Sequence, residues 1–143
     1  MANSSATDWL ISVDDHVIEP PTVWTDRLPA KYQDIGPRMV DSPDGELWLY
    51  EDKRVATLAM SVAAGHDTDF ISPNPVHFKD MRPGAYDPIA RVADMDRAGI
   101  LASLCFPSFP RFCGQIFWEA NDKDHALLCV LRLNVLVQQF LSI

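Results

Sequence analysis

The sequence predicts an α/β fold, and three segments carry that prediction. Residues 9–16 form a short, mostly apolar run that ends in acidic residues and a histidine. Residues 87–98 show helical spacing, and residues 100–106 form an uncharged, mostly apolar run of strand length. A strand, a helix and a second strand in this order are typical of a βαβ unit with parallel strands. Residues 17–86 would then be an excursion inserted between the first strand and the helix.

The first predicted strand ends in side chains that suit a divalent metal ion. Side chains alternate between the two faces of a strand, so Asp14 and His16 point one way and Asp15 the other. A carboxylate and an imidazole are ligands that zinc binds, but two protein ligands are one short of a usual catalytic site. The alternative is a turn acid beside a polar residue that caps the strand. For Asp15 and Glu19 we expect solvent exposure or a salt bridge, with Glu19 also a candidate substrate contact.

The excursion contains one regular feature. Residues 46–50 and 54–58 are strand-like runs on either side of a turn-like segment, which predicts a β-hairpin. Residues 26–40 carry two prolines and are expected to form an ordered loop. Residues 61–85 show no periodicity, and a connection of this length without regular structure is typical of a functional excursion.

The helix at residues 87–98 has clear start and stop signals. Asp87 and Pro88 suit the N-cap and the first helical position, and Gly99 suits a left-handed C-terminal position. The uncharged run at 100–106 follows at once, which predicts a strand buried on both faces, as in a parallel sheet.

The end of the chain is unusually apolar. Asn121 or Asp122 is expected to cap a second helix, within which we expect His125 to be exposed. From residue 126 to residue 143 the only charged side chain is Arg132. A helix that is apolar on nearly every side is typical of burial inside a larger protein or in a membrane. Residues 1–8, in contrast, are small and polar and predict a flexible tail.

Composition excludes several classes of function. The chain has 143 residues, enough for one domain, and a net charge of -8, which argues against nucleic acid and anionic membranes as partners. No run reaches the ~18 apolar residues that a membrane span needs, and the N-terminus does not resemble a secretory signal. The 3 cysteines form no C-x-x-C pair. Reduced cysteines in a cytoplasmic protein are therefore expected.

Two motifs resemble a known family. The string SVDDHVIEPP at residues 12–21, and RPGAYDP at residues 82–88, resemble the aminocarboxymuconate-semialdehyde decarboxylase-like branch of the metal-dependent amidohydrolase superfamily. The resemblance covers roughly residues 9–130. Further matching positions accompany the two motifs: Trp24, residues 27–29, Arg91, residues 95–96, residues 99–100 and residues 105–107.

The resemblance implies a distorted (β/α)₈ barrel with one catalytic divalent metal, zinc or manganese. Members are decarboxylases, hydratases or hydrolases of small carboxylated, often ring-derived substrates. Asp14 and His16 would be the metal ligands from the first strand. Many relatives have His-x-His or Glu-x-His at these positions. Ile18 occupies a position where the resemblance leads us to expect a further ligand. His77 and Arg82 in the excursion would meet a substrate carboxylate. The family's other ligands and its catalytic histidine lie on later strands, so none of its catalytic residues falls in this chain.

A (β/α)₈ barrel needs about 250 residues. The resemblance therefore implies an N-terminal barrel fragment over residues 9–130, with an atypical end at residues 131–143 that a shifted frame or an early stop near Val130 would explain. Firm metal binding by this chain alone is not expected, and its own enzymatic activity stays open. The alternative is a non-catalytic fragment, at most an interaction module, whose exposed apolar surface would favour homo-oligomers or aggregation.

Overall fold

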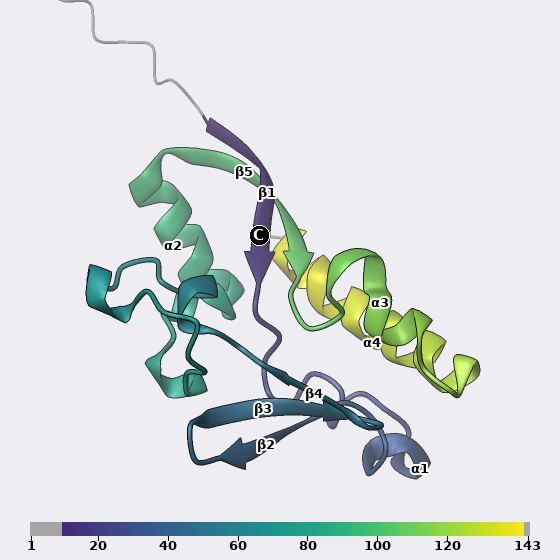
Figure 1. Ribbon diagram of the computed structural model, residues 1–143. Coiled ribbons are helices and arrows are strands. Elements are labelled where there is room, and N and C mark those ends of the chain that lie inside the picture. The colour runs from purple at the N-terminus through teal and green to yellow at the C-terminus, as the bar shows by residue number, and fades with distance from the viewer. Residues whose placement is uncertain (1–9, 142–143) are drawn as a thin grey trace, which may run out of the picture.

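The strands β1 (Leu10–Val17) and β5 (Ile100–Pro107) form a parallel pair in the computed structural model, which describes residues 10–141 (Figure 1). The helix α2 (Pro88–Ala98) precedes β5 and packs against it, so the βαβ unit expected from the sequence is present. The register aligns His16 with Phe106 and Asp15 with Cys105, and it shifts between Ser12 and Asp15. The tail predicted for residues 1–8, together with Trp9, lies outside the described residues.

The ends of α2 follow directly from the local sequence. The Asp87 carboxylate accepts the backbone N–H of Ala90 at 2.8 Å, and Pro88 occupies the first turn, where its missing N–H costs no helical hydrogen bond. Gly99 has φ 68° and ψ 29°, a left-handed conformation that ends the helix at little steric cost. β5 begins at the next residue and pairs parallel with β1.

The excursion forms a second sheet. The strands β2 (Arg38–Ser42), β3 (Gly45–Tyr50) and β4 (Lys53–Ala56) pair antiparallel in the order β2-β3-β4, below the parallel pair in Figure 1. The segment expected to be a loop, residues 26–40, is partly regular, because it contains the short helix α1 (Ala30–Gln33) and the start of β2. Four 3₁₀ turns occupy the remainder of the excursion: Ala59–Ser61, Thr68–Phe70, Phe78–Asp80 and Pro83–Ala85.

An aromatic cluster joins the excursion to the second half of the chain. Trp24 is fully buried, and its ring centroid lies 4.9 Å from that of Trp48 and 5.0 Å from that of Phe109. Its indole N–H donates to the carbonyl of Cys129 at 3.0 Å. Cys129 lies on α4 (Lys123–Leu141), which follows the short helix α3 (Gln115–Trp118). One side chain therefore ties the loop after β1 to the last helix.

The helix α4 buries one face of its described part and exposes apolar side chains on the other, in keeping with the exposed apolar surface expected of a fragment. Its buried stripe is Ala126, Cys129, Leu133 and Leu136, at the 3–4 residue spacing of a single helix face. Its outer side leaves Leu127, Leu131 and Val135 exposed. No helix within residues 10–141 combines the length and the apolar character needed to cross a membrane.

His125 is buried, and the expectation that it is exposed was wrong. Only 3% of its surface is accessible, and its ring stacks on that of Tyr32 with centroids 4.9 Å apart. The first turn of α4 faces α1, so the imidazole is covered by the aromatic ring rather than by water. The backbone N–H of His125 donates a hydrogen bond to the Asp122 carboxylate. Of the two candidate caps, Asn121 and Asp122, it is therefore Asp122 that caps the helix.

The parallel pair is less covered than the sequence predicts. A strand buried on both faces was expected at residues 100–106, but Leu101 and Leu104 are 56% and 52% exposed. On β1, Ile11 and Val13 are likewise exposed. The cause is that β5 pairs with β1 alone among the described strands, while helices cover the pair only in part.

Candidate functional site

Asp14 and His16 lie together near the carboxyl end of β1. The Oδ1 atom of Asp14 and the Nε2 atom of His16 are 3.7 Å apart, and both side chains are mostly exposed. Ligand distances of 2.0–2.2 Å around tetrahedral zinc place two donor atoms about 3.4 Å from each other. The two side chains therefore have the donor types and nearly the separation of two ligands of one ion.

No third ligand joins them within the described chain. Among residues 10–141, no three histidine, cysteine, aspartate or glutamate side chains gather as a group able to hold a metal ion. Asp15 faces away and accepts a hydrogen bond from Ser103, and its Oδ2 lies 3.2 Å from a guanidinium nitrogen of Arg91. Burial acts to raise the pKa of Asp15, but hydrogen bonds from Ser103 and Ser12 and the charge of Arg91 outweigh it and keep the pKa below its ordinary value. The expected salt bridge of Asp15 is thus present.

Glu19 is buried, contrary to the expected surface position. Only 1% of its surface is accessible, and its two carboxylate oxygens accept the backbone N–H of Phe109 at 3.0 and 3.1 Å. Burial raises the pKa of Glu19 to about 7, although backbone N–H groups of Glu19, Phe109 and Ser108 oppose the shift. This carboxyl group therefore exchanges its proton near neutral pH, which is the range that suits general acid–base chemistry.

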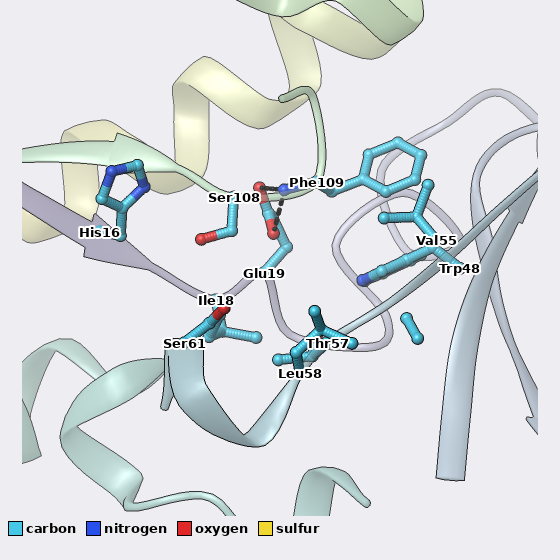
Figure 2. Close-up of a pocket in the computed structure, with 11 residues that line it drawn as sticks. His16, Ile18, Glu19, Trp48, Val55, Thr57, Leu58, Ser61, Ser108 and Phe109 are labelled. Carbon is cyan, nitrogen blue, oxygen red and sulfur yellow. Dashed lines mark hydrogen bonds between the residues drawn. The ribbon is translucent and has the colours of Figure 1, made fainter. Parts of the chain in front are cut away.

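A cavity of about 350 Å³ opens beside Glu19 (Figure 2). It lies between the end of β1, the segment around β4 and the loop after β5. Its ionisable lining side chains are His16 and Glu19, and the hydroxyl-bearing residues Thr57, Ser61 and Ser108 also border it. Trp48 and Phe109 provide aromatic walls. The hydroxyl group of Ser108 donates to the Val17 carbonyl at 2.9 Å, so it also has a structural role.

A second cavity, of about 560 Å³, is also bordered by His16. Asp14 and His16 both line it, and its apolar walls include Phe106 and Leu133. The loop after β5 also contributes Arg111 and Cys113, whose φ angles of 60° and 52° are uncommon for residues other than glycine. Such conformations cost about 1–3 kcal/mol and gather at functional sites. His16 and Ser108 border both cavities, and His16 is the ionisable side chain that they share.

The fold of this chain resembles that of an amidohydrolase. A crystal structure of an amidohydrolase from Mycobacterium avium subsp. paratuberculosis K-10 superimposes with a TM-score of 0.62 over 94% of this chain, at 19% sequence identity. This chain spans 38% of the length of that protein. No protein-family model matches the sequence. No curated protein matches it either. The comparison therefore establishes an amidohydrolase-like α/β fold.

The two candidate substrate contacts of the excursion have partners of their own. The Nδ1 atom of His77 lies 3.3 Å from a carboxylate oxygen of Glu46, and His77 lines neither cavity beside His16. Arg82 borders a third cavity, of about 320 Å³, together with His16, but its guanidinium donates two hydrogen bonds to Asp94 at 2.7 and 2.5 Å. The structure therefore places His16 with Asp14 beside one cavity and with Glu19 beside another, and it leaves His77 apart from both. The burial of Glu19 has no local signal in the sequence, because it depends on Phe109, far along the chain.

Proposed function

We propose that this chain belongs to a metal-dependent enzyme of the amidohydrolase type, a decarboxylase or hydrolase of small carboxylated, ring-derived substrates. The observation that carries the proposal is the 3.7 Å pair formed by Asp14 and His16 at the end of a strand in an amidohydrolase-like fold. Carboxyl ends of strands are where α/β barrels hold their catalytic groups. The sequence motifs at residues 12–21 and 82–88 support the aminocarboxymuconate-semialdehyde decarboxylase-like branch.

In this proposal Asp14 and His16 hold a divalent ion, zinc or manganese. When bound, the ion supplies a Lewis acid that polarises a substrate carboxylate or carbonyl. Asp15, held by Ser103 and Arg91, fixes the strand so that its two neighbours point to the opposite side. Glu19 takes up or releases a proton beside the same histidine. The further ligands must come from groups outside residues 10–141, as in a barrel of which residues 9–130 form the first part.

A second candidate is a non-catalytic role as an interaction module. The exposed apolar side chains of β1 and β5 favour it, because monomeric proteins seldom leave a contiguous apolar sheet face in water. Under this reading the chain is inactive alone, and residues 131–143 form an atypical end. Under both readings we place the protein in the cytoplasm.

Zinc titration of the purified chain tests the metal proposal. By calorimetry we expect only weak zinc binding, because two protein ligands are one short of a usual catalytic site, with a further loss of at least tenfold in Asp14→Ala and in His16→Ala. The matched control is His77→Ala, because His77 also lies beside a carboxylate, that of Glu46, yet lines neither of the two cavities. Manganese adds a second readout, since its paramagnetism should broaden the NMR signals of His16. Equal zinc binding by His16→Ala and the unaltered chain would contradict the proposal.

A further inference from the structure

The cavity beside Glu19 has an uneven distribution of charge. Among residues 10–141 no lysine or arginine lines it, and its ionisable side chains are His16 and Glu19. Glu19 is almost completely buried, so its charge is weakly screened by solvent. A carboxylate that entered this cavity would face a buried carboxyl group with no cationic side chain in the lining to offset the repulsion. The charge of the lining therefore favours a cation.

Aromatic side chains border this cavity. Trp48 and Phe109 are each 2% exposed, and their ring centroids are 5.3 Å apart. A cavity of about 150 Å³ is enough to hold benzene, so the volume of about 350 Å³ has room for one ring with a substituent. Figure 2 shows the Glu19 carboxylate between the His16 side and the aromatic side of this space.

We propose that this cavity binds a small cationic ring compound, with the Glu19 carboxylate as its counter-ion and Trp48 as its aromatic wall. As a ligand site the cavity needs no metal. As a substrate subsite it rests on the proposed function, and it then accepts the part of the substrate that bears an amino or similar N–H group. The carboxylate end of such a substrate belongs on the Asp14 side of His16.

Binding of a cation should displace a proton from Glu19. Because the pKa of Glu19 is about 7, a bound cation should release about half a proton to the buffer at pH 7 and about one at pH 5. The apparent affinity should rise about 50-fold between pH 5 and pH 7 and then level off, because only the carboxylate form is the counter-ion. His16 is the other titratable side chain in the lining. In a His16→Gln variant, any proton released on cation binding cannot come from this residue.

The experiment is calorimetry on the full chain without added metal, with benzylamine as the cation, benzyl alcohol as the neutral analogue and benzoate as the anion. Titrations at pH 7 in two buffers of different ionisation enthalpy give the number of protons released. We expect benzylamine to bind most tightly and benzoate most weakly. In Glu19→Gln, benzylamine should bind at least tenfold more weakly and release no proton. The matched control is Glu46→Gln, because Glu46 also accepts a backbone N–H, from Phe78, and does not line the cavity.

Three results would overturn the inference: benzoate binding as tightly as benzylamine, unchanged benzylamine binding in Glu19→Gln, or benzylamine binding without proton release in the unaltered chain. The last does not depend on whether the variant folds. The zinc titration tests the proposed function separately, because zinc binding depends on Asp14 and His16 and not on Glu19. If the unaltered chain bound benzylamine but no zinc, the metal proposal would be wrong and the cation site would stand.

Discussion

Both carboxylate oxygens of Glu19 accept the backbone N–H of Phe109, at 3.0 and 3.1 Å. Glu19 follows β1 and Phe109 follows β5, so one side chain joins the segments that leave two parallel strands. The hydroxyl group of Ser108 adds a second link, to the carbonyl of Val17. The carboxyl ends of the pair are therefore held together by a group whose charge is costly to bury.

That cost predicts a dependence of stability on pH. The folded pKa of Glu19, about 7, lies above its ordinary value of 4.5, so the folded state holds the proton more firmly than the unfolded state. Glu19 contributes about 3 kcal/mol to the free energy of unfolding. This contribution is fully present below pH 4.5 and is lost as the pH rises through 7. Urea unfolding at pH 5, 6 and 7 should show this fall, and Glu19→Gln should flatten it. The exposed Glu119→Gln is the control, and an equal flattening there would disprove the assignment.

The aromatic cluster predicts that substitution of Trp24 lowers the free energy of unfolding strongly, whereas substitution of Trp118 has little effect on it. Trp24→Phe removes part of a fully buried side chain and leaves the Cys129 carbonyl without the indole N–H. We expect a loss of about 2–4 kcal/mol in the free energy of unfolding, measured by urea denaturation. Trp118→Phe is the matched control, because Trp118 is 80% exposed, and it should change stability by less than about 0.5 kcal/mol. Comparable losses in the two variants would contradict the central position of Trp24.

The ion pair between Arg82 and Asp94 depends on the absence of a side chain at Gly84. A Cβ atom at Gly84 would clash with Oδ2 of Asp94, so Gly84→Ala should displace that carboxylate from Arg82. We expect Gly84→Ala to lower the melting temperature, and to lower it less when Arg82→Ala is already present, since the pair is then already broken. Arg97→Ala is the comparison, because Arg97 contacts the same carboxylate but is 73% exposed, and it should have little effect. Full additivity of the first two substitutions would argue against this coupling.

The uncovered parallel pair predicts self-association. Val13 on β1 and Leu104 on β5 are 69% and 52% exposed, on strands whose outer edges have no described partner. We expect a concentration-dependent increase in mass by sedimentation, and we expect Val13→Lys or Leu104→Lys to reduce it. Ala30→Lys adds the same charge at an exposed position of α1 and should leave the association unchanged. Equal reduction by all three would indicate a general effect of charge rather than contact through the sheet.

Local chemistry made part of this fold predictable. Asp87, Pro88 and Gly99 each specify a backbone conformation by themselves, so both ends of α2 could be placed without knowing what the helix packs against. The parallel arrangement of β1 and β5 follows from that helix, because a strand, a helix and a strand return the chain in the same direction. The proximity of Asp14 and His16 follows from the alternation of side chains along a strand.

Features that depend on distant partners were not predictable in this way. Residues 38–42 become β2 because β3 offers them a strand edge, with Met39 opposite Trp48. His125 is buried because Tyr32, from α1, covers its ring. Its helical spacing to Cys129 was the one available signal, since residues four apart share a helix face. The burial of Glu19 requires both the excursion and the loop after β5, and neither is visible from its neighbours in sequence.

His16 lines two cavities, so the binding of a ligand in one should affect the binding of a ligand in the other. An ion held by Asp14 and His16 and a cation beside Glu19 would repel each other, because both would lie next to the same imidazole. Each should therefore weaken the binding of the other by the same factor, since coupling between two sites is reciprocal. A substrate that is negative at one end and positive at the other escapes this antagonism, because it offers each cavity the charge that the cavity prefers.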